Sequence, residues 1–165
     1  YYPAEKEIKN EKIKILFYGS FIPLHGIDVI LNAFSLMEKK NIKFEATIIG
    51  KGQIFPEMKT LYNALNLKNV TMDGKLISEN ELSEIIRQND IVLGIFGNSK
   101  KARSVIPNKV YQSTASGKCT VTMNSEVLKE FYNKDDLVIC NNTPESLANI
   151  LTELINNPNK IHKIG

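Results

Sequence analysis

Two stretches of the chain combine glycine with side chains that could bind an anion. They span residues 19–26 and 97–109, and each lies between an apolar run and an amphipathic run. Where such a stretch joins a strand to a helix, the helix start offers unpaired N–H groups and a partial positive charge, which suit a phosphate. In an open parallel sheet, ligands bind at the carboxyl ends of the strands, where these loops lie. The pattern predicts an anion site for a phosphorylated or nucleotide ligand.

The first stretch contains Gly19, Ser20, His25 and Gly26. Glycine lets a ligand approach the backbone closely. The imidazole of His25, at the expected helix entrance, could donate a hydrogen bond to a phosphate or a sugar hydroxyl. The alternative is a histidine that caps local backbone, and the position of the loop at the ligand edge of the sheet favours the first interpretation.

The second stretch holds cations, namely Lys100, Lys101, Arg103 and Lys109. Together they would favour a diphosphate and its departure as a leaving group. A solvated lysine-rich loop is the alternative, and Lys100 and Lys101 fit either. Lys109 follows Pro107 in the first turn of an expected helix, where a cation opposes the helix dipole. Its position needs another reason, so we predict that it binds the anion.

Other motifs are weaker or missing. Gly50 and Gly52 follow the second apolar run and fit a tight turn as well as a ligand contact. The three glycines and acidic residue of a dinucleotide-binding fingerprint are absent, which argues against an NAD-dependent dehydrogenase. No Asp-x-Asp pair, cysteine–histidine metal spacing or G-x-S-x-G motif occurs. We therefore predict a metal-independent ligand site.

Apolar runs and amphipathic stretches alternate along the whole chain, and Gly, Pro and capping residues separate them. We predict an α/β fold, a Rossmann-like three-layer sandwich with a parallel sheet of about six strands and helices on both faces. The last helix is expected to end near Pro158, which leaves His162 in a frayed tail. The expected strands are residues 13–18, 44–49, 70–72, 91–96, 119–123 and 137–140.

Length and composition fit one globular domain. The chain has 165 residues, of which 42% are hydrophobic and 24% charged. A net charge of +3 is too small to indicate nucleic acid, and no membrane-length apolar run or signal peptide is visible. Two cysteines, Cys119 and Cys140, in apolar runs indicate buried thiols in a reducing compartment, so a cytoplasmic location is expected.

The expected organisation is a short polar segment followed by one domain. Residues 1–11 are polar without a period and are predicted to be a linker or tether, while residues 12–165 form the folded domain. The chain opens with Tyr1 rather than methionine, so we expect it to be part of a longer protein.

The order and spacing of several segments add a resemblance to a known family. Over residues 13–157 the chain resembles the C-terminal, donor-binding domain of the group 1 (family 4) glycosyltransferases of the GT-B type, in which two Rossmann-like domains face a cleft. The segments that support the resemblance are residues 18–26, 48–52, 70–74, 89–94 and 107–118.

Three positions depart from the family pattern. His25 stands where the family usually has a diphosphate-binding lysine. Ser104 and Gln112 stand where it commonly has two glutamates, which face the donor sugar and grip the ribose. Gln112 can still hydrogen-bond a ribose without the strength of a carboxylate, whereas Ser104 is too short to reach as far as glutamate.

The resemblance implies a nucleotide-sugar site made by residues of several loops. The nucleoside would lie near Gly50, Gly52 and Lys75. The diphosphate would meet the Gly19–Gly26 loop, Lys109 and Arg103, and Gln112 would hold the ribose.

The implied activity is transfer of a sugar from a nucleotide-diphosphate sugar to an acceptor, with retention of configuration and without a metal, in polysaccharide or glycoconjugate biosynthesis. The nucleotide sugar is a substrate, and no cofactor is expected. The acceptor would bind an N-terminal domain of the same protein, and any peripheral association with the inner face of a membrane would involve that half. The domain alone is expected to be inactive. A sugar-nucleotide epimerase of the same fold and a non-catalytic nucleotide-sugar-binding module are the alternatives.

Overall fold

Alternating strands and helices form the part of the chain that the structure, a computed structural model, describes: residues 12–102, 104, 106–132 and 136–164. The expected linker, residues 1–11, lies outside the described residues. The strands are β1 (Ile13–Tyr18), β2 (Phe44–Ile49), β3 (Val70–Asp73), β4 (Ile91–Leu93), β5 (Cys119–Met123) and β6 (Val138–Cys140). The helices are α1 (Ile27–Lys39), α2 (Phe55–Leu65), α3 (Glu79–Arg87), α4 (Asn108–Ala115), α5 (Glu126–Phe131), α6 (Pro144–Asn156) and α7 (Pro158–Ile164), with a 3₁₀ turn at Pro23–His25.

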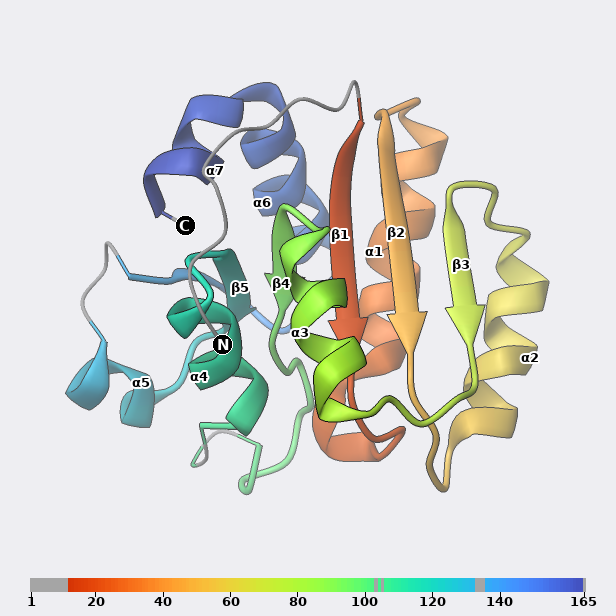
Figure 1. Cartoon of the computed structure of the whole chain (residues 1–165). Coiled ribbons are helices and arrows are strands. Elements are labelled where there is room, and N and C mark those ends of the chain that lie inside the picture. The colour runs from red at the N-terminus through yellow and green to blue at the C-terminus, as the bar shows by residue number, and fades with distance from the viewer. Residues whose placement is uncertain (1–11, 103, 105, 133–135, 165) are drawn as a thin grey trace.

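The sheet has the order β3-β2-β1-β4-β5-β6, and every pairing between neighbouring strands is parallel (Figure 1). Side chains of a strand alternate between the two faces. In β1, Ile15 and Phe17 join the large core beneath α1, α2, α6 and α7, whereas Leu16 and Tyr18 join a smaller core with α3. A third cluster links α4 and α5. These layers confirm the predicted Rossmann-like sandwich.

The fourth strand is shorter than predicted. Residues 91–96 were expected to form it, yet β4 ends at Leu93. Beyond that point the Thr122 hydroxyl accepts a hydrogen bond from the Ile95 amide at 3.2 Å and lies 3.3 Å from the Ile95 carbonyl oxygen. Backbone pairing with β5 continues past Leu93, since the Gly94 amide donates to the Val121 carbonyl oxygen at 2.7 Å and the Met123 amide to the Ile95 carbonyl oxygen at 3.2 Å. The Ile95 amide, however, is bound by the Thr122 side chain, and Ile95 and Phe96 stay buried.

The end of the described chain differs from the prediction. The helix predicted to end near Pro158 does so, since α6 ends at Asn156, but Pro158 then begins α7, because proline is tolerated in the first turn of a helix. Ile161 of α7 is buried in the main core. His162 therefore lies on a packed helix, and its placement in a frayed tail was wrong.

The loops that follow β1, β2 and β4 pack backbone against backbone at the carboxyl edge of the sheet. The Phe96 amide donates to the His25 carbonyl oxygen at 3.0 Å. Gly26 has a φ of 63°, and a Cβ there would lie 2.3 Å from the Phe96 carbonyl carbon. A Cβ on Gly50 would lie 1.8 Å from the Gly19 carbonyl oxygen. Glycine at these two positions lets the loops converge.

Replacing Gly26 with alanine should destabilise the fold. The side chain would both occupy a left-handed conformation and press on the Phe96 backbone, so we expect a loss of about 2 kcal/mol or more in the free energy of unfolding. Asn41, exposed with a φ of 58°, provides the control, because Asn41→Ala places alanine in a left-handed conformation where a Cβ is already accommodated. Chemical denaturation of both variants measures the difference, and equal losses would contradict the close-contact argument.

Candidate functional site

The ammonium group of Lys109 lies inside the carboxyl edge of the sheet. Lys109 is the second residue of α4 and is 5% exposed. Its Nζ lies 3.7 Å from the centroid of the Phe17 ring and 3.5 Å from the Tyr18 carbonyl oxygen. The loop after β1 is therefore joined by a cation from the start of α4, the helix that connects β4 to β5.

This ammonium group has no carboxylate partner among the described residues. Burial lowers the pKa of Lys109 well below its usual range. An aromatic face attracts a cation, but one long contact to a carbonyl oxygen leaves N–H donors unused. A buried, incompletely satisfied cation next to a helix start is well suited to an anionic ligand.

His25 lies beside Lys109 and is 8% exposed. Its Nδ1 donates to the Ser20 carbonyl oxygen, and its ring meets Phe17 edge-on with centroids 5.8 Å apart. Burial, followed by the charge of Lys109, lowers the pKa of His25 to about 4, against the opposing effect of the bond to Ser20. At neutral pH the imidazole is therefore uncharged, and Nε2 presents a lone pair.

Gly19 marks the point where both side chains converge. A Cβ at Gly19 would lie 3.4 Å from Cε1 of His25 and 3.5 Å from Nζ of Lys109. The two side chains, predicted separately from two loops, thus face the same short piece of backbone. The geometry agrees with the histidine that caps local backbone, because Nδ1 donates to Ser20. The uncharged ring has no second N–H, so Nε2 can accept a hydrogen bond from a sugar hydroxyl but cannot donate one to a phosphate.

A hollow of about 200 Å³ adjoins this point, above the ends of β1 and β2. Four of the residues predicted to bind the ligand line it, namely Gly19, Ser20, Gly50 and Lys75. Leu76, 80% exposed, stands at the same hollow and offers it an apolar surface. Four of the predicted residues are therefore gathered around one cavity.

Gln112 is tied to the same strand end through Tyr18. The Tyr18 hydroxyl donates to Oε1 of Gln112 at 2.6 Å. Sequence reasoning missed Tyr18 and Phe17 as site residues because apolar and aromatic residues in a strand usually serve the core. Their place directly before Gly19, at the end of the first strand, was the available signal.

The remaining predicted residues lie elsewhere. Gly26 and Gly52 contact loop backbone, of Phe96 and Phe21 respectively. Ser104 is exposed, and its hydroxyl lies 2.9 and 3.2 Å from the carbonyl oxygens of Lys100 and Lys101, within its own turn. Arg103 lies outside the described residues.

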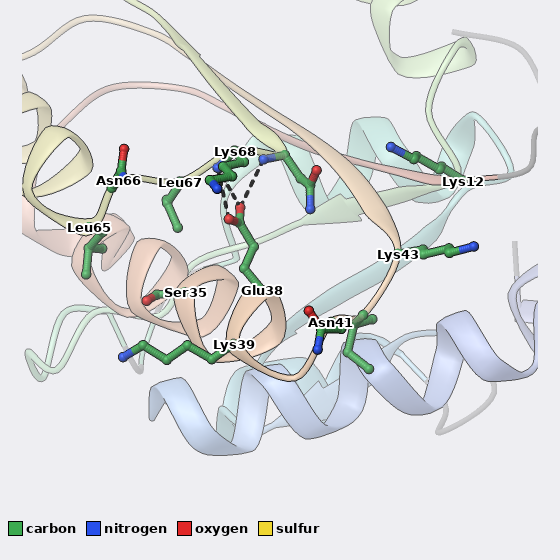
Figure 2. Close-up of a pocket in the computed structure, with 12 residues that line it drawn as sticks. Lys12, Ser35, Glu38, Lys39, Asn41, Lys43, Leu65, Asn66, Leu67 and Lys68 are labelled. Atoms are coloured by element: carbon green, nitrogen blue, oxygen red, sulfur yellow. Dashed lines mark hydrogen bonds between the residues drawn. The ribbon is translucent and has the colours of Figure 1, made fainter.

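A larger hollow, of about 790 Å³, lies at the opposite, amino edge of the sheet (Figure 2). The ends of α1 and α2 border it, so the partial charge of both helix termini there is negative. The Glu38 carboxylate accepts hydrogen bonds from the Lys68 and Asn69 amides at 2.9 to 3.1 Å and joins α1 to the turn before β3. Lys39 and Lys43 point to opposite sides in Figure 2. Lys39, in the last turn of α1, complements the dipole of that helix, so this edge suits cations and not anions.

Three further observations concern the chemistry open to the described residues. Within the described residues, no group of three histidine, cysteine, aspartate or glutamate side chains is placed to hold a metal ion. No helix in that part of the chain is long and apolar enough to cross a membrane. Burial raises the pKa of Cys119 and of Cys140 to about 12, so both buried thiols are poor nucleophiles.

Comparison with known proteins decides the family. The sequence profile of the family described as "Glycosyl transferases group 1" matches residues 2–165. The chain belongs to this family. No curated protein sequence matches it at a significant level.

Crystal structures with the same fold include the C-terminal domain of a group 1 glycosyl transferase family protein, LpcC, from Francisella tularensis, at 19% identity and a TM-score of 0.77. The match covers 99% of this chain and 89% of that one. The catalytic domain of the Helicobacter pylori cholesterol-alpha-glucosyltransferase is 18% identical with a TM-score of 0.69, covering 92% and 91%. The Anabaena protein Alr3699/HepE, in complex with UDP and glucose, is 14% identical with a TM-score of 0.75. The match to it covers 93% of this chain but 41% of that chain.

The low pKa of His25 predicts a pH-dependent stability. In the unfolded chain the His25 imidazole takes up a proton near pH 6.5, whereas in the folded chain it does so near pH 4. The free energy of unfolding should therefore fall as pH falls through this interval, because the unfolded state binds the proton more readily. From pH 7 to pH 5 we expect His25 to lower the free energy of unfolding by about 1–2 kcal/mol. His25→Gln keeps an N–H donor for Ser20 and should flatten this part of the denaturation profile.

Proton NMR tests the same prediction directly. The chain has two histidines, so His162→Gln assigns their ring signals. The His25 ring signals should hold their position between pH 7.5 and pH 5.5, and a midpoint near pH 6.5 would contradict the burial argument.

Proposed function

We propose that the chain is the donor-binding domain of a glycosyltransferase that transfers a sugar from a nucleotide-diphosphate sugar to an acceptor. The observation that supports this most directly is the Lys109 ammonium group, 5% exposed and without a carboxylate partner among the described residues, beside the hollow at the carboxyl edge. A diphosphate would supply the negative charge that the protein does not. Membership of the group 1 family supplies the class of reaction.

The chemistry asked of this domain is stabilisation of a leaving group. When the bond between the sugar and the diphosphate breaks, negative charge grows on the bridging oxygen. Lys109 and the N–H groups at the start of α4 are fixed in place before that charge appears. No side chain here need act as a nucleophile, because positioning and charge stabilisation lower the barrier.

The nucleoside would occupy the hollow lined by Gly19, Gly50 and Lys75, with Leu76 against its base and Gln112 near its ribose. Crystal structures of the Anabaena relative contain UDP and UDP-glucose, which makes UDP the first ligand to test. The same proposal includes retention of configuration and independence of a metal. It also includes a role in polysaccharide or glycoconjugate biosynthesis and a cytoplasmic location at the inner face of a membrane. An N-terminal acceptor-binding domain is its proposed partner.

A non-catalytic nucleotide-sugar-binding module is the second candidate. Ser104, at the position of the family's first glutamate, is exposed and hydrogen-bonded within its own turn, so it offers nothing to a donor sugar. Both candidates bind a nucleoside diphosphate. Sugar transfer by the full-length protein supports the enzyme, and its absence with intact nucleotide binding supports the module. Epimerisation of a nucleotide sugar without an acceptor would indicate an epimerase instead.

Ligand-observed NMR with UDP, GDP and ADP tests the shared premise. The chain should bind at least one of the three diphosphates and transfer no sugar on its own. The corresponding nucleosides should bind more weakly, because they lack the charge that Lys109 neutralises. The absence of a binding signal for all three diphosphates would overturn the proposed function.

Replacing Lys109 with methionine separates binding from folding. Methionine fills the same space without a charge, so stability should be unchanged or higher, since an unpaired buried cation is costly. Affinity for the diphosphate should fall about 10²-fold, the value of one or two charge-assisted hydrogen bonds.

The control is Lys100→Met, which removes one exposed positive charge from the same loop. Calorimetric titration should find its affinity within about twofold of the wild type, because exposed charges are well screened. Equal losses in both variants would mean that general charge, and not the buried ammonium group, attracts the ligand.

A further inference from the structure

Tyr18, the last residue of β1, contacts two residues of α4 that lie one helical turn apart. Its carbonyl oxygen lies 3.5 Å from Nζ of Lys109, and its hydroxyl donates to Oε1 of Gln112 at 2.6 Å. Tyr18 is 6% exposed and its ring packs in the core shared with α3. A rigid, buried side chain thus holds the amide of Gln112.

An amide side chain has two chemically different ends. Rotation of the Gln112 amide would exchange its oxygen for its nitrogen and so exchange an acceptor for two N–H donors. A phenol that donates to Oε1 stabilises one of these orientations. Nε2 then carries two N–H donors on the other side, and among the described residues it makes no hydrogen bond. A carboxylate at this position would need no such orientation, because its two oxygens are equivalent.

We infer that Tyr18 is a positioning residue of the nucleotide site, which turns the Gln112 amide so that an N–H donor meets a ribose hydroxyl oxygen. The inference rests on the proposed function. Residues three apart on a helix are neighbours, so Gln112 presents this donor beside the ammonium group of Lys109. In a nucleoside diphosphate the ribose is attached directly to the diphosphate. A donor next to a diphosphate-binding cation is therefore within reach of that sugar.

The experiment compares the affinities of Tyr18→Phe and wild type for UDP and 2′,3′-dideoxy-UDP, with the GDP and ADP pairs in parallel. Phenylalanine keeps the buried ring and removes the hydroxyl. The wild type should prefer the ribonucleotide. In Tyr18→Phe its affinity should fall about three- to tenfold, the value of one neutral hydrogen bond, while dideoxynucleotide affinity stays within twofold.

Tyr62→Phe is the matched control. The Tyr62 hydroxyl donates to the Val70 carbonyl oxygen at 2.6 Å, an equally short hydrogen bond between α2 and β3. Its loss should leave both affinities unchanged. Equal weakening of the ribonucleotide and the dideoxynucleotide by Tyr18→Phe would overturn the inference, because it would show a structural role alone.

The same comparison in a Gln112→Glu variant separates the proposed role of Tyr18 from a general loss of stability. In Gln112→Glu, either carboxylate oxygen accepts a hydrogen bond from a ribose hydroxyl, so adding Tyr18→Phe should leave the ribose preference unchanged. The same loss of preference in both backgrounds would overturn the inference. A wild type that binds none of the diphosphates overturns the proposed function as well, whereas a preference retained in Tyr18→Phe overturns this inference alone.

Discussion

Lys109 brings an ammonium group into the carboxyl edge of the sheet, where the Phe17 ring and the Tyr18 carbonyl oxygen are its contacts. Removing a cation from water costs several kcal/mol unless partners replace the lost hydration. A cation–π contact returns about 1–2 kcal/mol, and the long contact to the carbonyl oxygen returns little. The remaining cost is tolerable where an anion binds and compensates it. Most other features of this edge follow from holding that group in place.

Close approach of the loops is the first of these features. Lys109 comes from α4, whereas Phe17, Tyr18 and Gly19 belong to β1 and the loop after it. The two regions meet because Gly26 lies against the backbone of Phe96, and the loop after β1 is in turn packed on Gly50. Each contact excludes a Cβ, so the shape of the site depends on absent side chains as much as on present ones.

Sequence reasoning was sufficient for the layers, and it singled out Lys109, because both depend on local patterns. Short apolar runs identified the strands, and an unexpected cation after Pro107 drew attention to Lys109. Contacts between distant parts of the chain could not be predicted from the sequence. The bond between Tyr18 and Gln112 spans 94 residues, and the Thr122 hydroxyl that binds the Ile95 amide beyond β4 comes from β5. Packing against the main core, invisible in the sequence of residues 158–164, makes α7 a helix.

The two edges of the sheet show why size alone does not identify a site. In a parallel sheet, a helix that connects two strands begins at the carboxyl edge and ends at the amino edge. The larger hollow lies at the amino edge, between the ends of α1 and α2, where the backbone favours cations and Lys39 occupies the last turn of α1. The smaller hollow lies at the carboxyl edge, where the starts of α1 and α4 favour anions. There the protein adds a neutral histidine and a buried cation, and among the described residues no carboxylate pairs with that cation. An anion bound at this edge would raise the pKa of both Lys109 and His25, and so strengthen the charges that hold it.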